Sequence, residues 1–451
     1  MLIEFTVGNY RSFKDPQTLS MVATSLKSKD ERVDVNNVIK MDGQPNLLTS
    51  AAIYGANASG KSNLIDALGF MRSFVLTSPR QTERTGGIEA EPFRLSLNTL
   101  NKPSFFEVVF VIEDTRYRYG FELTAERVER EWLHHVPSTR EADLFVRQGD
   151  RVKVGRSFPE GKELFERTRP NALFLSVAAQ FNGPVASKLL DWFSRLLFTG
   201  MDSRRRSRAW GWSQYRPAFH TQRYLEIPQR AKEINDLVQR LDLNIRGIHL
   251  DETIVQLPLF TDEEVSEVPE SAQASDKAKP FRERRISTVR TAHTLYDEDD
   301  QPIGETLFEM DEQESEGTRR LFALAGPLLS ALRFGRVMIV DELDARLHPL
   351  MTREIVRLFN NRQTNSHGAQ IIFSTQDTNL LDNELFRRDQ IWFVEKNSQG
   401  ASQLYSLAEI QGVRNDLSYE RGYIQGRFGA VPYLNPNKLQ ALLVEGDGEG
   451  A

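Results

Sequence analysis

The first 125 residues alternate apolar and polar positions in short runs that are typical of strands. Residues 1–25 carry two such runs, and residues 104–123 carry two more around an acidic turn, which predicts a hairpin. Residues 51–54 form a short apolar run that leads into a glycine-rich segment, and residues 64–74 then carry apolar side chains at helical spacing. This region therefore predicts a strand–loop–helix unit among shorter strands.

Further along the chain, helix-like and strand-like segments alternate. Residues 185–198 and 223–241 predict amphipathic helices, whereas the acidic, Ser-, Ala- and Pro-rich stretch 261–280 predicts a loop. A helix is predicted over residues 317–334, and strands are predicted over residues 286–296, 305–310, 337–340, 370–374 and 391–394. Strands that alternate with helices indicate an α/β fold with a parallel sheet.

Composition narrows the class of protein. The chain has 451 residues, a formal net charge of −6, 39% hydrophobic residues and no cysteine. The lack of cysteine excludes disulfides, thiol catalysis and zinc–thiolate sites. No apolar stretch reaches the roughly 18 residues of a membrane-spanning helix, and the N-terminus lacks a signal-peptide pattern. We therefore expect a soluble cytoplasmic protein with no membrane partner.

The most specific motif follows the apolar run at residues 51–54. It reads Gly55-Ala56-Asn57-Ala58-Ser59-Gly60-Lys61-Ser62 and matches GxxxxGK[ST] at every fixed position. Backbone N–H groups of such a loop curl around phosphates, and the helix N-terminus adds a partial positive charge. Lys61 is expected to reach the β- and γ-phosphates of ATP, and Ser62 to ligate Mg²⁺. The alternative interpretation is a glycine-rich turn with an incidental lysine. The predicted strand before the motif and the predicted helix after it make this alternative weak.

A second motif lies where the predicted strand 337–340 ends. Asp341 and Glu342 follow it directly. Asp341 is expected beside Mg²⁺, and Glu342 is expected to polarise the attacking water. Two adjacent acids are also common in the first turn of a helix, so the pair is informative mainly together with the phosphate loop.

A third segment, residues 314–318, precedes the predicted helix 317–334. A Ser/Gly pair at a helix start, here Ser315 and Gly317, is a possible anion site, although the same residues also suit a plain helix cap. Because the chain already has one phosphate loop, a second phosphate-binding helix start suggests a site that another copy of the chain completes.

These motifs resemble those of ATP-binding-cassette (ABC-type) ATPases of the SMC and DNA-repair type, including the OLD-like AAA family. The resemblance is closer to the ATPases of abortive-infection (AbiL-like) and restriction-linked (RloA-like) phage-defence loci. It covers roughly residues 1–125 and 285–435, and the middle matches loosely. The segments that carry it are residues 5–13, 55–64, 314–318, 341–344, 347–349, 389–396 and 422–432.

The resemblance implies an α/β fold, an ABC-type P-loop ATPase head with a mixed or parallel sheet and a mainly helical inserted lobe. The implied division is 1–125 for the N-terminal part of the head, 126–260 for the inserted helical lobe, 261–284 for an acidic flexible loop, 285–415 for the C-terminal part of the head and 416–451 for a tail. It implies ATP and Mg²⁺ as cofactors. It also adds nucleotide-binding roles for Arg11, Ser12, Asn63 and Asp344.

The chain departs from the family at two places. Where relatives usually have a histidine that contacts the γ-phosphate and the attacking water, this chain has Gln376. An amide donates a hydrogen bond but cannot take a proton, so we expect slow or regulated hydrolysis with Glu342, Lys61 and Gln376 as the catalytic set. No clear glutamine marks the loop that joins the phosphate site to the helical lobe, and residues 91–94 are the candidate substitute.

Arginines and aromatic residues interleave in the middle of the chain, at Arg204, Arg205, Arg206, Arg208, Trp210 and Trp212. Such a pattern suits nucleic-acid binding, through phosphate contacts and base stacking. A solvated loop or a protein-docking patch fits as well, since the chain is acidic overall. The acidic run at residues 297–300 predicts a hairpin turn in preference to a metal site.

The leading functional hypothesis is an ATP-driven molecular switch of an anti-phage, abortive-infection system. It would act as a homodimer or higher homo-oligomer with ATP between subunits, and it would control a separate effector, a nuclease or toxin. A DNA-repair or SMC-like ATPase is the alternative, which the lack of heptads for long arms opposes. A nucleotide-binding scaffold that scarcely hydrolyses ATP is a third hypothesis, which Gln376 favours and Glu342 opposes.

Overall fold

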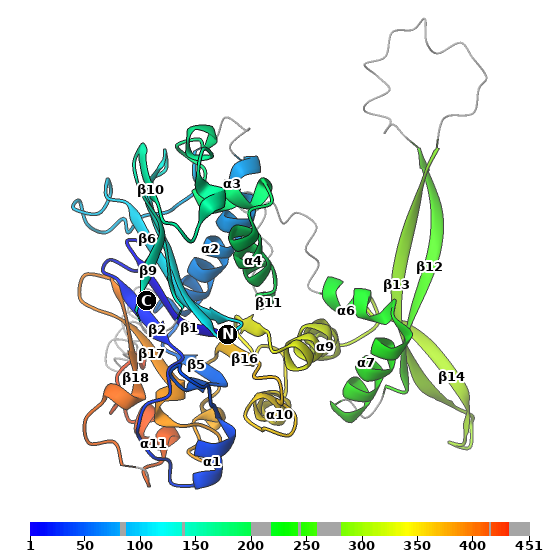
Figure 1. Cartoon of the computed structure of the whole chain (residues 1–451). Helices are drawn as coiled ribbons and strands as arrows, with labels where there is room; N and C mark the ends of the chain where they lie inside the picture. The colour runs from blue at the N-terminus through cyan, green and yellow to red at the C-terminus, as the bar shows by residue number, and fades with distance from the viewer. Residues whose placement is uncertain are drawn as a thin grey trace, which may run out of the picture. The chain divides into compact units, whose positions relative to one another are not determined.

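The computed structural model divides into two compact units, residues 1–215 with 330–451 and residues 216–329. It describes residues 1–81, 87–137, 140–199, 218–241, 245–258, 281–414 and 416–432. Figure 1 shows the elements of both units, and each unit is described by itself. Within the described part of the chain, no helix is long and apolar enough to cross a membrane.

One sheet of the first unit is antiparallel throughout. Its strand order is β10-β9-β8-β7-β6-β1-β2. The strands are β1 (Leu2–Gly8), β2 (Gln17–Ser20), β6 (Ser104–Ile112), β7 (Thr115–Leu123), β8 (Val128–Val136), β9 (Ala142–Gln148) and β10 (Arg151–Val154). The predicted hairpin at residues 104–123 is confirmed as β6–β7, with Ile112 opposite Thr115.

The other large sheet of this unit is mixed and carries the chemical motifs. Its order is β11-β15-β16-β5-β17-β18, parallel from β11 to β17, with β18 antiparallel. The strands are β5 (Ser50–Tyr54), β11 (Leu197–Thr199), β15 (Val337–Val340), β16 (Gln370–Ser374), β17 (Ile391–Lys396) and β18 (Ser402–Ser406). The predicted α/β class with a parallel sheet is therefore confirmed, and the parallel strands end at one common edge.

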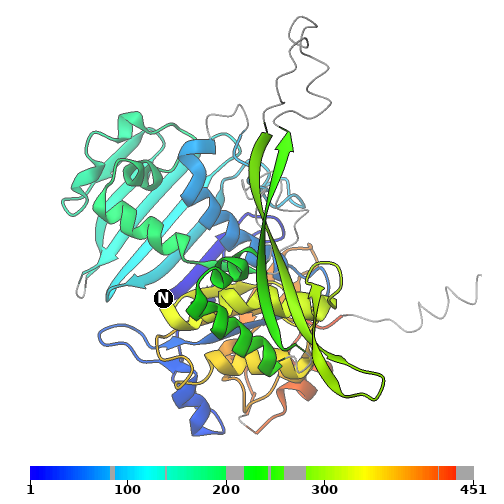
Figure 2. The same cartoon turned by 90° about the vertical axis from the view of Figure 1, so that its right-hand side faces the viewer.

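Helices of the first unit pack on the antiparallel sheet. Figures 1 and 2 show α2 (Lys61–Gln81), α3 (Phe174–Gln180) and α4 (Pro184–Ser194) on one face of it. Phe110 of β6 stacks on Trp192 of α4 with ring centroids 4.0 Å apart. One buried apolar cluster joins this sheet, these helices and β5, so the start of α2 has a fixed place beside β5. The remaining short elements are α1 (Glu31–Asn36), β3 (Val38–Ile39), β4 (Leu47–Leu48), α10 (Pro349–Phe359) and α11 (Tyr419–Ile424).

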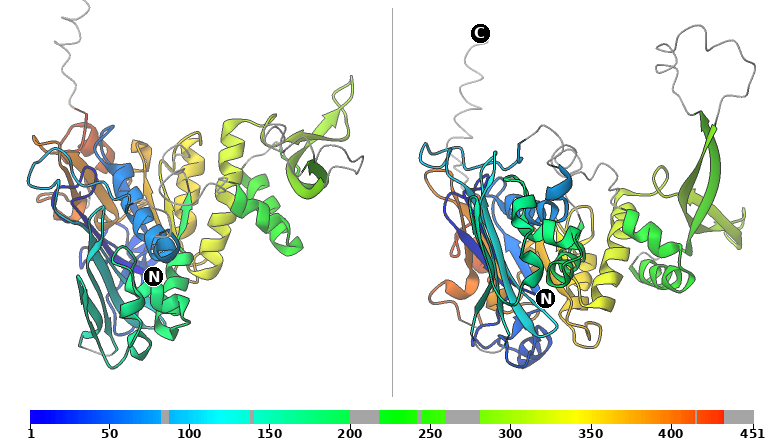
Figure 3. Two further views of the ribbon diagram at one scale, coloured as in Figure 1. Left: turned by 90° about the horizontal axis from the view of Figure 1, so that it is seen from above. Right: turned by 45° about the horizontal axis from the view of Figure 1, so that its top comes forward.

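The second unit has a three-stranded antiparallel sheet and helices. Figure 3 gives further views of its elements, which are α6 (Phe219–Leu225), α7 (Pro228–Leu241), β12 (Gly247–Pro258), β13 (Phe281–Tyr296), β14 (Pro302–Glu309) and most of α9 (Glu316–Phe334). Thr221 Oγ1 donates to Phe322 O at 2.8 Å and accepts from Gly326 N at 3.0 Å. A Cβ at Gly326 would lie 2.6 Å from Thr221 Cα, so glycine is required for this close approach of α6 and α9.

The expected helical lobe over residues 126–260 is wrong at its beginning. Strands β8, β9 and β10 occupy most of residues 128–154 and extend the antiparallel sheet. Glu131 and Arg147 are charged residues at buried positions, so they interrupt the apolar alternation that predicts a strand. Arg147 Nη1 lies 3.6 Å from Glu131 Oε2. Glu131 also accepts hydrogen bonds from Phe174 N and Leu175 N, at the start of α3. A buried charged pair thus looks like a polar loop in sequence.

Other sequence predictions fare differently. The acidic run 297–300 forms the predicted turn, with Asp297 N donating to Gln301 O at 2.9 Å. The Arg/Trp patch at 204–212, most of the acidic loop 261–284 and most of the tail 416–451 lie outside the described residues. The predictions made for them stay predictions.

Candidate nucleotide site

The phosphate loop connects β5 to α2 with a backbone that needs glycine. Gly55 and Gly60 have φ of 156° and 118°, and Ala58 has φ of 61°. A Cβ at Gly55 would come within 2.3 Å of Val394 O. The two fixed glycines of the motif therefore let the loop curl tightly against β17, as loops that bind phosphates through backbone N–H groups do.

Lys61 begins α2 and lies against its own loop. Its Nζ donates to Gly55 O at 2.7 Å and to Ala56 O at 3.2 Å. Burial lowers the pKa of Lys61, while the charges of Asp341, Glu342 and Asp344 act in the opposite direction. The ammonium group is thus held among acids at the mouth of the loop, where a polyphosphate would be an additional favourable partner.

Asp341 lies beside Ser62, as the two motifs predict. Asp341 Oδ1 accepts from Ser374 Oγ at 2.6 Å and from Ser62 Oγ at 3.3 Å. A carboxylate and a hydroxyl oxygen fit the preference of Mg²⁺ for oxygen ligands. In the described ranges, no group of three or more acidic or histidine residues could hold a metal by itself. This donor set therefore suits an ion that also takes ligands from phosphate and water.

Glu342 adopts an unusual backbone conformation. Its φ is +51°, in the left-handed region that few non-glycine residues occupy. Its N–H donates to Ser374 Oγ at 2.8 Å, which fixes the bend at the end of β15. The bend turns the Glu342 side chain away from the strand direction, and this exposed side chain lines the cavity of the phosphate loop.

A cavity of about 380 Å³ unites the predicted motifs. Gln376, which follows β16, lines it with its exposed side chain, and Gln376 N donates to Asp344 Oδ2 at 3.3 Å. The full lining is Asn57, Ala58, Ser59, Gly60, Lys61, Ser62, Asn63, Glu342, Gln376 and Lys396. All three predicted catalytic residues line this cavity. Lys61 belongs to the phosphate loop, and Glu342 and Gln376 lie beside it because β15 and β16 end at the same edge of the sheet as β5.

Arg11 and Ser12 support the loop from the first turn of the chain. Arg11 forms ion pairs with Asp66 of α2 and, at 3.7 Å, with Glu91. Ser12 Oγ accepts from Asn63 Nδ2 at 2.8 Å. Neither residue lines the cavity. Arg11 N also donates to Glu91 O at 2.7 Å, so the segment at residues 91–94 contacts Arg11 and not the cavity itself.

Ser315 and Gly317 lie in the second unit, at the start of α9. Ser315 Oγ accepts from Thr318 N at 3.1 Å, as a helix cap does. Glu314 contacts β13, with its Oε1 2.6 Å from His293 Nε2 and hydrogen-bonded to Thr291. Ser315 itself is exposed.

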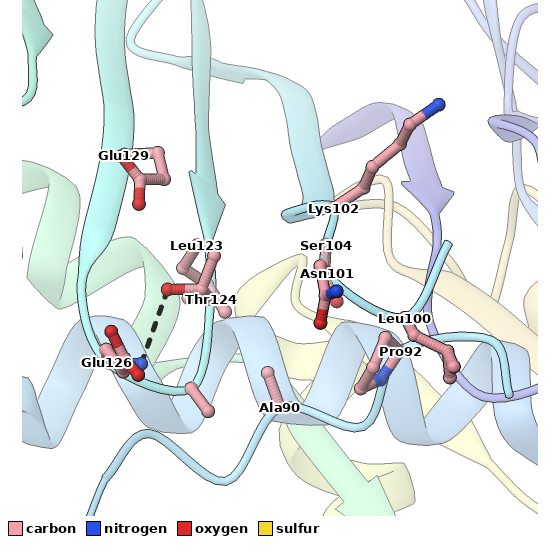
Figure 4. Close-up of a pocket in the computed structure, with 11 residues that line it drawn as sticks. Ala90, Pro92, Leu100, Asn101, Lys102, Ser104, Leu123, Thr124, Glu126 and Glu129 are labelled. Carbon is pink, nitrogen blue, oxygen red and sulfur yellow. Dashed lines mark hydrogen bonds between the residues drawn. The ribbon is translucent and has the colours of Figure 1, made fainter. Parts of the chain in front are cut away.

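A second cavity of the first unit contains none of the predicted site residues. Figure 4 shows it between residues 90–104 and the turn from β7 to β8. The hydrogen bond drawn there joins Glu126 N to Thr124 Oγ1 at 3.3 Å. The cavity therefore shares no residue with the cavity of the phosphate loop.

Three residues of the site were not predicted from the sequence: Ser374, Lys396 and Ser402. Ser374 holds both Asp341 and Glu342. Lys396 ends β17 and lines the cavity. A partial signal existed for Ser374 and Lys396, because both lie at or just after the ends of predicted strands, but the order of these strands beside β5 exists only in the folded sheet. For Ser402 there was none, since it depends on the β17–β18 pairing.

A phosphate loop between a parallel strand and a helix, with acids at the end of another parallel strand of the same sheet, defines a P-loop ATPase fold. A family described as "AAA domain, putative AbiEii toxin, Type IV TA system" matches residues 50–382. The chain belongs to this family. This match does not extend to the finer AbiL-like or RloA-like resemblance, which stays a prediction. A search of curated proteins gave no match.

Solved structures of SMC head domains are similar at low identity. The SMC head domain from Thermotoga maritima is 14% identical, with 90% of this chain and 98% of that chain covered and a TM-score of 0.37. An SMC head bound to the C-terminal winged-helix domain of ScpA is 13% identical, with 94% and 99% covered and a TM-score of 0.41.

Proposed function

We propose that the chain is an ATP-binding and ATP-hydrolysing molecular switch of an anti-phage defence system. The convergence of the phosphate loop, Glu342 and Gln376 on one cavity is the observation that carries the ATPase proposal. The family description, which names a putative toxin of a type IV toxin–antitoxin system, supports a defence role. The control of a separate effector, a nuclease or toxin, is proposed from the resemblance of the sequence alone.

Each residue of the site has a chemical role in this proposal. The loop N–H groups and Lys61 bind the β- and γ-phosphates. Mg²⁺, held by Ser62 and Asp341, would neutralise phosphate charge when bound. Glu342 polarises the attacking water, and Gln376 donates a hydrogen bond towards the γ-phosphate. Because an amide cannot take the proton of the water, the switch turns over slowly.

The ATP site is completed by a second subunit. The exposed Ser315 and the first N–H groups of α9 form a surface for an anion. A two-fold axis would place this surface of each subunit over the phosphate loop of the other and create two sites at once. Asp344, which accepts a hydrogen bond from Gln376 N at 3.3 Å, would lie near that axis in this arrangement.

The hydrolysis of ATP by the purified chain, with and without Mg²⁺ and with and without DNA, tests this function. We expect slow, Mg²⁺-dependent turnover that DNA leaves unchanged. Strong stimulation by DNA would favour the SMC-like alternative. Tight ATP binding without single-turnover hydrolysis would favour the scaffold, and a failure to bind ATP would contradict the proposal.

A further inference from the structure

The end of β17 brings a second lysine to the phosphate loop. β17 runs parallel to β5, with Phe393 opposite Tyr54, so both strands end at the same edge of the sheet. Val394 O then lies against Gly55. Two residues further along, Lys396 lines the same cavity as Lys61.

The hairpin that carries Lys396 is bonded to the loop. Lys396 lies opposite Ser402 in the β17–β18 register. Ser402 Oγ donates to Ser59 O at 2.5 Å, and Ser402 N donates to Ser12 O at 2.7 Å. A Cβ at Gly60 would come within 2.3 Å of Ser402 Oγ, so the contact leaves no space for a side chain. The backbone of Lys396 therefore has a defined position relative to the phosphate loop.

The residue before Lys396 explains its orientation. Glu395 Oε2 accepts from Ala430 N at 2.8 Å, so the Glu395 side chain contacts the C-terminal segment. Tyr405 OH donates to Phe428 O at 2.8 Å and strengthens the same contact. Successive side chains of a strand point to opposite faces. Lys396 consequently faces the other way, which is the side of the phosphate loop.

Lys396 differs from the other cations near the loop in its partners. Arg11 is neutralised by Asp66 and a second carboxylate. Lys61 donates to two carbonyls of its own loop. Lys396 is exposed, and in the part of the chain that the structure describes it forms no ion pair. Its ammonium group is therefore available to an anion in the cavity.

The order of the strands determines on which side of the phosphate loop Lys396 lies. In the order β15-β16-β5-β17, the acids after β15 and Gln376 after β16 lie on one side of β5, and Lys396 lies on the other. Asp341 and Gln376, which are expected beside Mg²⁺ and the γ-phosphate, lie on the β15–β16 side. Lys396, on the β17 side, is therefore placed for the phosphates that ATP and ADP share.

We propose that Lys396 binds the part of the phosphate chain that ATP and ADP share. The inference rests on the proposed ATP binding and adds to it a second cation, supplied from the far end of the chain. Asp341, Glu342 and Asp344 repel the phosphates, and a cation on the β17 side of the loop offsets part of this repulsion. Because ADP carries the same α- and β-phosphates, the contact serves both nucleotides equally.

Equilibrium binding of ADP and of a non-hydrolysable ATP analogue to Lys396→Met, Lys396→Arg and wild type tests the proposal. Loss of one charged hydrogen bond in an open cavity weakens binding by about 10-fold. We expect this loss for both nucleotides in Lys396→Met, and near-complete rescue in Lys396→Arg. Lys14→Met is the matched control, because Lys14 Nζ donates to Gln399 Oε1 at 3.0 Å in the same hairpin turn but does not line the cavity.

Three results would overturn the assignment. If Lys396→Met binds both nucleotides as tightly as wild type, Lys396 does not contact the nucleotide. If only the affinity for the ATP analogue falls, Lys396 contacts the γ-phosphate instead. If Lys396→Arg loses as much nucleotide affinity as Lys396→Met, the positive charge of Lys396 is not what binds the nucleotide. Wild-type protein that binds neither nucleotide would instead contradict the proposed function. Thermal unfolding confirms that each variant is folded.

Discussion

The phosphate loop and the helix start at Ser315 are held in place by different kinds of contact. The loop is fixed by residues from distant parts of the sequence, including Ser12, Val394 and Ser402. Ser315 is fixed mainly by its own helix, through Thr318. We propose that these two surfaces are the two half-sites for ATP. The phosphate loop therefore depends on contacts between distant parts of the first unit, and the helix start depends on a short local motif.

This difference separates two functions. A rigid loop with non-local support suits tight binding of the nucleotide, because little conformational freedom remains to be lost. A locally capped helix start with an exposed Ser315 suits a contact that forms only when another subunit arrives. Variants of the loop should therefore affect ATP binding, whereas variants of the helix start should affect hydrolysis alone.

The largest effect on ATP binding is expected from Lys61→Ala. Its ammonium is the main protein cation on the β- and γ-phosphates, so ATP affinity should fall by roughly 100-fold. Equilibrium binding of ATP measures this loss. Lys102→Ala, whose side chain lines the separate cavity of Figure 4, should bind ATP like wild type. Equal binding by Lys61→Ala and wild type would refute the phosphate-loop assignment.

Glu342→Gln should separate binding from chemistry within the first half-site. The amide cannot polarise the attacking water as a carboxylate does, so single-turnover hydrolysis should slow by roughly 100-fold or more while ATP binding persists. If Glu342→Gln hydrolyses ATP at the wild-type rate, the role of Glu342 as general base is wrong.

Ser315→Arg tests the second half-site. A bulky side chain at the exposed helix start should prevent closure on the partner subunit and slow hydrolysis by about 10-fold, with ATP binding to the loop unchanged. Ser315→Thr keeps a capping hydroxyl and should retain most activity. A Ser315→Arg variant that binds ATP poorly would contradict the proposed division between binding and hydrolysis.

The smallest effect concerns pH. Burial lowers the pKa of Lys61 from its ordinary value of 10.5, so its charge is lost at a lower pH than that of an exposed lysine. The charged form binds phosphate, and kcat/KM for ATP should therefore decline with rising pH before pH 10.5 is reached. A pH profile of kcat/KM that stays flat up to that pH would contradict the burial of Lys61.

The sequence predicted the strand, loop and helix of the nucleotide site better than the long-range contacts that hold them in place. Apolar runs and the spacing of Gly55, Lys61 and Asp341 identify the strand, loop and helix, because that chemistry is local. The left-handed backbone of Glu342 and its bond to Ser374 could not be predicted, since β15 and β16 meet only in the folded sheet. Lys396 was missed for the same reason, although its strand was predicted.

The fold was mispredicted where charge is buried. Glu131 and Arg147 lie inside β8 and β9 and neutralise each other, so their strands lack a clean apolar alternation. Local pattern cannot distinguish such a pair from exposed polar residues. The pairing is visible only when β8 and β9 are side by side.

Mixing Lys61→Ala and Ser315→Arg subunits tests the shared ATP site most directly. Each variant alone lacks one half of every site and should be nearly inactive. In a mixed dimer, the loop of the Ser315→Arg subunit meets the intact helix start of the Lys61→Ala subunit, which restores one of two sites. With random pairing, half of the dimers are mixed, so we expect about a quarter of the wild-type ATPase rate per subunit. No recovery of activity, in a sample where mixed dimers are demonstrated, would contradict the shared site.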